Sequence, residues 1–111
     1  MCEVTVSREK DALRAKLSCE LDHHAAKTVR QRIDDALAEH RPRRLILDFG
    51  SVPFMDSSGI GLILGRVTKA AAIGASVSVC GLSPTLMRLV KLSGLDRIRG
   101  LELTASGNEG K

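Results

Sequence analysis

The first pattern along the chain is an alternation of apolar and polar residues. It runs through Glu3–Arg8 and again through Leu13–Cys19, with the period of two that half-buried strands have. Only the short polar stretch 9–11 separates the two segments. They are therefore predicted to pair as a hairpin.

Helical spacing follows. Asp22–His40 carries an apolar stripe at four-residue intervals, with Asp22 as the expected N-cap. A second helix is predicted over Ser57–Ile73. Ser83-Pro84 opens a third helix, because serine is a good cap and proline suits the first helical position; Gly94 closes it.

Three further strands are expected between and after these helices. Leu45–Phe49 is a nearly continuous apolar run, typical of a central strand covered on both faces. Ser76–Cys80 is the next strand, and a short one lies near Arg99–Leu103. The order predicts an α/β fold with a mixed four- to five-stranded sheet and helices packed against it. One domain spans 1–104, and 105–111 is expected to be a flexible tail.

The candidate site is the segment Phe54–Gly61, which leads from a strand into the second helix. Sites in open α/β sheets form at such positions. Unpaired N–H groups and the helix dipole favour an anion there, so a phosphate on Ser58 is stabilised. Gly59 and Gly61 present no side chains, so that another protein can approach the backbone.

The plainer alternative is that Asp56 or Ser57 caps the helix and the glycines allow tight packing. Two glycines in the first turns count against it, since each costs about 1 kcal/mol of helix stability relative to alanine. The residues alone still favour the cap, because caps are far commoner than phosphorylation sites.

Catalysis by this chain is not expected. An acyl-transfer serine needs a base close by, but the only histidines besides His40 are His23 and His24, which are adjacent helical residues that point in different directions. No G-x-S-x-G elbow and no complete glycine-rich nucleotide motif is present. We expect no catalytic residue, cofactor site or metal site.

The amino-acid composition argues against some classes of binding partner. The 111 residues are 43% hydrophobic and 27% charged, with a net charge of +4, which is typical of a globular domain. Phe49 and Phe54 are the only aromatic residues, which argues against base stacking on single-stranded nucleic acid. The basic cluster Arg41–Arg44 is interpreted as a solvated turn, and nucleic-acid binding through it is the less favoured reading.

Localisation is expected to be cytoplasmic. The chain has no stretch of about 18 apolar residues and no signal-like start. Cys2, Cys19 and Cys80 form no C-x-x-C pair, so neither a disulfide framework nor a zinc site is predicted. Free thiols suit a reducing compartment.

Two motifs resemble the anti-sigma factor antagonists of the STAS domain superfamily. They are Glu20–Ala26 and Phe54–Arg66, with weaker similarity through Val79–Pro84 and Ser93–Leu95. The histidine pair within the first motif points to the sporulation type. The resemblance implies a STAS fold.

It also implies a function. The unphosphorylated protein would bind an anti-sigma factor that is also a serine kinase and so release the sigma factor. Phosphorylation of Ser58, not Ser57, would end binding, and a serine phosphatase would reset the protein. The expected partner surface comprises Asp22, Asp56, Ser57, Ser58, Gly59, Gly61 and Leu62.

A second reading stays open: a scaffolding STAS domain of a stress-signalling or membrane-associated assembly. The compact length favours the antagonist, which is expected to be monomeric when free, with no membrane or direct nucleic-acid contact. Large oligomers would favour the scaffold.

Overall fold

The chain begins with an antiparallel hairpin. A computed structural model describes residues 3–105, in which β1 (Glu3–Glu9) pairs with β2 (Ala12–Ser18) along their whole length, from Glu3 opposite Ser18 to Glu9 opposite Ala12. The predicted hairpin is confirmed. Apolar residues of β2 point to one side and are buried, as the alternation indicates.

Three parallel strands extend this hairpin. β3 (Arg44–Asp48) lies beside β2, β4 (Ser76–Leu82) beside β3, and β5 (Leu101–Ala105) beside β4. The described residues thus form a five-stranded mixed sheet in the order β1-β2-β3-β4-β5, as predicted. Ala105, expected to start the tail, is the last residue of β5; the rest of that expected tail lies outside the described residues.

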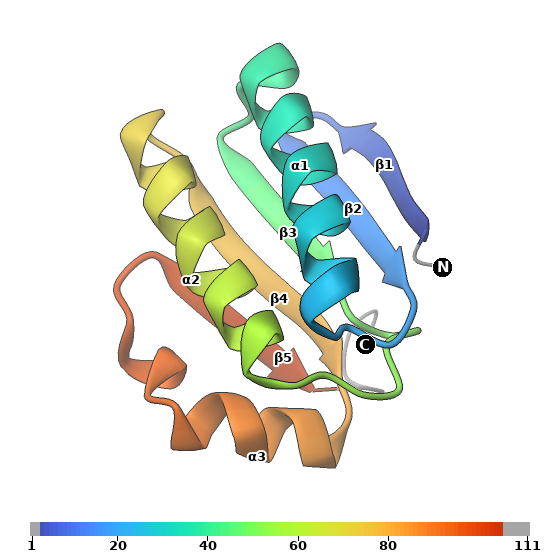
Figure 1. Cartoon of the computed structure of the whole chain (residues 1–111). Helices are drawn as coiled ribbons and strands as arrows, with labels where there is room; N and C mark the ends of the chain where they lie inside the picture. The colour runs from blue at the N-terminus through green and yellow to red at the C-terminus, as the bar shows by residue number, and fades with distance from the viewer. Residues whose placement is uncertain (1–2, 106–111) are drawn as a thin grey trace.

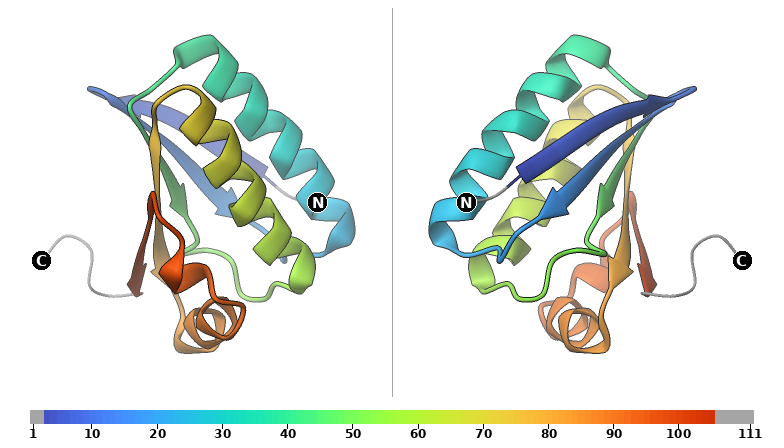
Figure 2. Two further views of the ribbon diagram at one scale, coloured as in Figure 1. Left: turned by 90° about the vertical axis from the view of Figure 1, so that its left-hand side faces the viewer. Right: turned by 90° about the vertical axis from the view of Figure 1, so that its right-hand side faces the viewer.

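Helices α1 (His23–His40) and α2 (Ser57–Ala72) cover one face of the sheet (Figures 1 and 2). α3 (Pro84–Leu92) lies across the end of the sheet, at the carboxyl ends of the parallel strands (Figure 1). It is followed by a short 3₁₀ turn, η1 (Leu95–Arg97). The predicted caps Asp22 and Ser83 both accept a backbone N–H.

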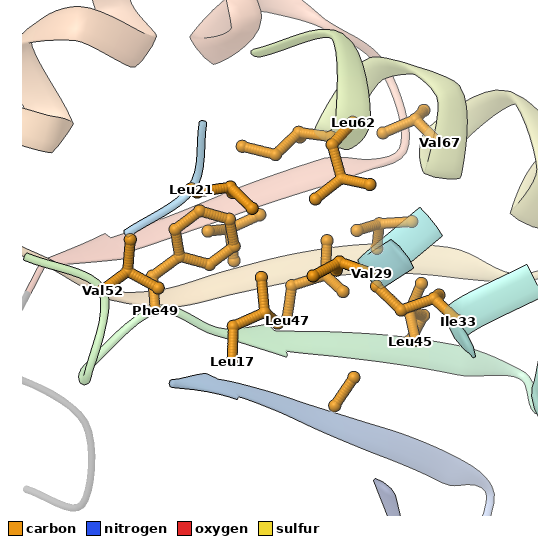
Figure 3. Packing of buried hydrophobic residues seen from close by; sticks show 14 of the residues in the cluster. Leu17, Leu21, Val29, Ile33, Leu45, Leu47, Phe49, Val52, Leu62 and Val67 are labelled. Atoms are coloured by element: carbon orange, nitrogen blue, oxygen red, sulfur yellow. The ribbon is translucent and has the colours of Figure 1, made fainter. Parts of the chain in front are cut away.

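The core fills the layer between the sheet and the two covering helices. Leu17, Leu45 and Leu47 rise from the strands toward Val29 and Ile33 of α1 (Figure 3). All five are fully buried. The chain has few aromatic residues, so this packing is mainly aliphatic and depends on close side-chain fit.

In the described range 3–105, no helix covers the opposite face of the sheet (Figure 2). Ile46 and Asp48 of β3 are therefore only half-buried, and the prediction that this strand is covered on both faces is wrong. Polar contacts occupy this face instead: Arg14 Nη1 donates to Asp48 Oδ2 at 3.1 Å and to Cys80 Sγ at 3.6 Å. A single acid in an apolar run was the signal of a one-sided strand.

The cysteines also depart from expectation. Cys19, directly after β2, is disulfide-bonded. The prediction of free thiols is therefore wrong for this residue, because an odd number of cysteines still permits one bonded pair.

Candidate functional site

A short parallel bridge joins the segments that lead into α1 and α2. It pairs Leu21 with Met55. The Leu21 N–H donates to the Phe54 carbonyl oxygen at 2.8 Å, and the Asp56 N–H donates to the Leu21 carbonyl oxygen at 3.3 Å. Because each helix starts directly after the bridge, their N-termini lie side by side at the carboxyl ends of the parallel strands (Figure 1).

Both helices begin with an aspartate cap. Asp22 Oδ1 accepts the Ala25 N–H at 2.9 Å, and Asp56 Oδ1 accepts the Ser58 N–H at 2.8 Å. Of the two caps considered for α2, Asp56 is the one that forms. Each carboxylate satisfies an orphan donor and complements the positive end of the helix dipole.

Ser57 and Ser58 are adjacent but face different surroundings. Ser57 is exposed, whereas Ser58 is half-buried and lines a hollow of about 490 Å³ between the two helices. We call it the α1–α2 hollow; its lining residues are His23, Ala26, Lys27, Arg30, Ser58, Gly61 and Leu62. Of the two serines, Ser58 lines this hollow and Ser57 does not.

The absence of a side chain has a different structural consequence at Gly59 and at Gly61. A Cβ on Gly59 would lie 2.7 Å from Met55 Sδ and 3.0 Å from Met55 Cβ, so this glycine lets α2 pack on the bridge segment. A Cβ on Gly61 would meet no atom within 4 Å. Gly61 therefore leaves open the wall of the α1–α2 hollow.

Two apolar residues frame the site. Leu62 is only 4% exposed and points from α2 toward the sheet (Figure 3), so it forms the floor of the α1–α2 hollow and offers little surface of its own. Phe54 is 53% exposed beside the bridge. Phe54 begins the candidate segment predicted from the sequence but was not among the residues expected to contact a partner, although an aromatic residue at the start of the serine motif was an available signal.

An ion pair clamps the two helices beyond the hollow. Arg66 of α2 is 3% exposed, and its Nε lies 2.9 Å from Asp34 Oδ1 of α1, although the contact lacks hydrogen-bond geometry. Burial lowers the pKa of Arg66; Asp34 opposes this and Arg30 adds to it. Nothing in the sequence pattern singled out this pair.

The remaining polar candidates do not converge on Ser58. His24 is exposed, and His40, at the far end of α1, lines a separate hollow with Arg41 and Arg43. Arg44 instead contacts Glu102 at 3.6 Å. The expected basic cluster is thus divided between two surfaces. Within residues 3–105, no group of three or more His, Cys, Asp or Glu is placed to hold a metal ion.

No helix in the described part of the chain is long and apolar enough to cross a bilayer.

The sequence of this chain matches a known domain family and a curated relative. A family model described as the STAS domain matches residues 4–106. An anti-sigma F factor antagonist of Paenibacillus polymyxa is 35% identical over 96 residues, which cover 86% of this chain and 82% of that protein.

Two solved structures are similar over nearly the whole chain. The anti-sigma factor antagonist SpoIIAA in its unphosphorylated form is 29% identical with a TM-score of 0.79, covering 96% of this chain and 90% of that one. The Bacillus cell fate determinant SpoIIAA in the phosphorylated form is 29% identical with a TM-score of 0.72, covering 96% and 94%. The chain therefore belongs to the STAS domain family, in the group of the anti-sigma factor antagonists.

Proposed function

We propose that this chain binds an anti-sigma factor that is also a serine kinase, and that phosphorylation of Ser58 ends the binding. The unphosphorylated form occupies the anti-sigma factor and so releases its sigma factor. A serine phosphatase removes the phosphate and restores the binding form. This cycle of binding, phosphorylation and dephosphorylation takes place in the cytoplasm, where ATP is available.

The observation that carries the proposal is the position of Ser58. Its backbone N–H is held by Asp56, so the residue is fixed at the start of α2. Ser58 lines the α1–α2 hollow together with Gly61, which has no side chain. Similarity to SpoIIAA structures in unphosphorylated and phosphorylated forms supports a switch of this kind.

The chemistry is a phosphoryl transfer from ATP. The Ser58 hydroxyl oxygen forms a bond to the γ-phosphorus while the bond from that phosphorus to the bridging oxygen breaks. ADP leaves, and the hydroxyl proton passes to a base of the kinase or to water. The chain itself acts as the acceptor, and its role is to hold the hydroxyl in an accessible position.

The added group carries about −1.5 to −2 charges and three acceptor oxygens. At the start of α2 it is tolerated, because the helix dipole favours negative charge. Within a closed interface it requires space and a counter-charge. A penalty of about 2.7 kcal/mol lowers affinity about a hundredfold without any change of fold.

The partner surface that we propose surrounds Ser58. Asp22 and Asp56 directly follow the bridged residues Leu21 and Met55, and the ring of Phe54, directly before Met55, is exposed. Aromatic residues in such positions often carry a large share of binding energy. The surface is completed by four residues of α2. Ser57 lies exposed at its rim, and Gly59 and Gly61 keep the helix free of side chains there. Leu62 forms the floor of the hollow.

The test compares two forms of the same chain. The unmodified protein is immobilised with ADP or ATP, and the captured partner is identified by mass spectrometry and purified. Calorimetry then measures its affinity for the unmodified chain and for the chain phosphorylated on Ser58. We expect a partner with serine kinase activity and about a hundredfold weaker binding of the phosphorylated form. Equal affinities would overturn the switch.

A further inference from the structure

The α1–α2 hollow contains two cations that the phosphoryl acceptor alone does not explain. Lys27 and Arg30 of α1 line it together with Ser58 of α2. They lie three residues apart, and His23 lies four residues before Lys27, so all three share one face of α1. The same face presents two exposed positive charges to the serine that we propose is modified.

These cations are not neutralised within residues 3–105. No ion pair in that range includes Lys27 or Arg30. The acids farther along α1 have other partners: Asp34 contacts Arg66 at 2.9 Å, and Asp35 accepts a hydrogen bond from Gln31 at 3.0 Å. Arg30 also repels the positive charge of Arg66 and so helps to lower the pKa of Arg66.

We propose that Lys27 and Arg30 bind the phosphate of phosphorylated Ser58 within the α1–α2 hollow and are thereby withdrawn from the partner. This inference rests on the proposed function for its setting. A phosphate offers three acceptor oxygens, and lysine and arginine form charge-assisted hydrogen bonds with such groups. The hollow, at about 490 Å³, has room for the phosphate and both side-chain ends.

The charges around the phosphate oppose one another. Lys27, Arg30, the N-terminus of α2 and, when protonated, His23 favour the dianion. The carboxylate of Asp56, which holds the Ser58 N–H at 2.8 Å, disfavours it, as does that of Asp22 at the start of α1. Lys27 and Arg30 line the hollow itself, as His23 does, and their long side chains can extend toward the phosphate.

The consequence concerns how the switch works. Before modification, the two cations give the hollow a charge of about +2, which suits an acidic surface of the partner. The phosphate adds about −1.5 to −2, so the hollow becomes nearly neutral. Binding is then lost because two positive contacts disappear, in addition to any repulsion by the phosphate.

The test separates this inference from the kinase. Phosphoserine is incorporated at position 58 during translation, so no kinase is needed, and ³¹P NMR follows the second ionisation of the phosphate, which lies near pH 6 in a free phosphoserine. Cations stabilise the dianion and lower this pKa. In the Lys27→Gln/Arg30→Gln variant we expect it to rise by about 0.5 unit or more.

A matched control removes the same charge elsewhere. Arg88 and Lys91 of α3 are exposed and line a different hollow, so the Arg88→Gln/Lys91→Gln variant is expected to leave the phosphate pKa unchanged. Repeating both titrations with His23→Gln removes the imidazole as a contributor. Equal shifts in the two double variants, or no shift in either, would overturn the inference and leave the kinase reaction untouched. A shift confined to the hollow variant, together with failure of a kinase to modify Ser58, would refute the proposed function alone.

Discussion

Leu21 and Phe54 connect the starts of two helices that are far apart in sequence: the N–H of Leu21 donates to the carbonyl oxygen of Phe54 at 2.8 Å. This contact lies in the Leu21–Met55 bridge. It brings the capping carboxylates of Asp22 and Asp56 to one end of the sheet, so that the two sequence motifs form one surface.

The two glycines of α2 are expected to respond to alanine with opposite signs. Gly59→Ala would place a methyl group 2.7 Å from Met55 Sδ, and overpacking of this kind costs about 1–3 kcal/mol. Gly61→Ala meets open space and gains up to about 1 kcal/mol of helix propensity. Urea unfolding of both variants measures the difference. A stabilised Gly59→Ala protein would show that Met55 moves aside freely.

The Gly61→Ala protein also tests the use of the α1–α2 hollow. Its added methyl group lies in the wall beside Ser58, so partner affinity is expected to fall although the protein is more stable. Calorimetry with the purified partner checks this. Unchanged affinity would mean that the partner does not approach the Gly61 backbone.

Asp22 combines a structural and an electrostatic role that two substitutions separate. Asp22→Ala removes the acceptor for the Ala25 N–H and is expected to lower the free energy of unfolding by about 1 kcal/mol. Asp22→Asn keeps a good cap and removes only the charge. We expect it to preserve stability and weaken partner binding. If both variants bound the partner like the wild type, Asp22 would serve only as a cap.

The Asp34–Arg66 contact is expected to be strongly cooperative. Removing the carboxylate with Asp34→Ala leaves a buried guanidinium without its counter-charge, which costs about 3 kcal/mol. Adding Arg66→Met to that variant is expected to restore most of the stability, because the orphaned charge is then gone. Chemical unfolding of the two single variants and the double variant gives the coupling energy. Additive effects would contradict the clamp.

Phe54 is expected to matter for binding and not for folding. Its ring is 53% exposed, so Phe54→Ala should change stability by less than about 0.5 kcal/mol. Loss of a central aromatic contact is expected to weaken partner affinity at least tenfold, about 1.4 kcal/mol. Leu92 on α3, which is 80% exposed, provides the matched control, because Leu92→Ala removes a more exposed apolar side chain away from the site.

Local patterns predicted the elements well because each depends on short-range chemistry. The alternation in β1 and β2 and the caps Asp22 and Ser83 act over a few residues, and the structure confirms them. The uncovered face of β3 was missed, since an apolar run does not say what lies above it. The meeting of Lys27 with Ser58 in one hollow depends on how α1 packs beside α2, which no periodicity specifies.

The features of the candidate site also fall into those that the sequence predicts and those that depend on tertiary packing. The serine motif and the cap of α2 were accessible from the sequence, and so was Gly61 as an open position. The different reason for Gly59 was not, because it depends on where Met55 lies. Arg66 was also missed, since a cation on a helix resembles a surface residue until the position of Asp34 is known.

The most direct test of the central claim asks which serine accepts the phosphoryl group. The purified partner and radiolabelled ATP are incubated with the wild-type chain, Ser58→Ala and Ser57→Ala, and the modified residue is mapped by mass spectrometry. Ser57 is the matched control, because it is adjacent and more exposed. The account predicts loss of incorporation in Ser58→Ala and retention in Ser57→Ala. Full incorporation into Ser58→Ala would contradict it.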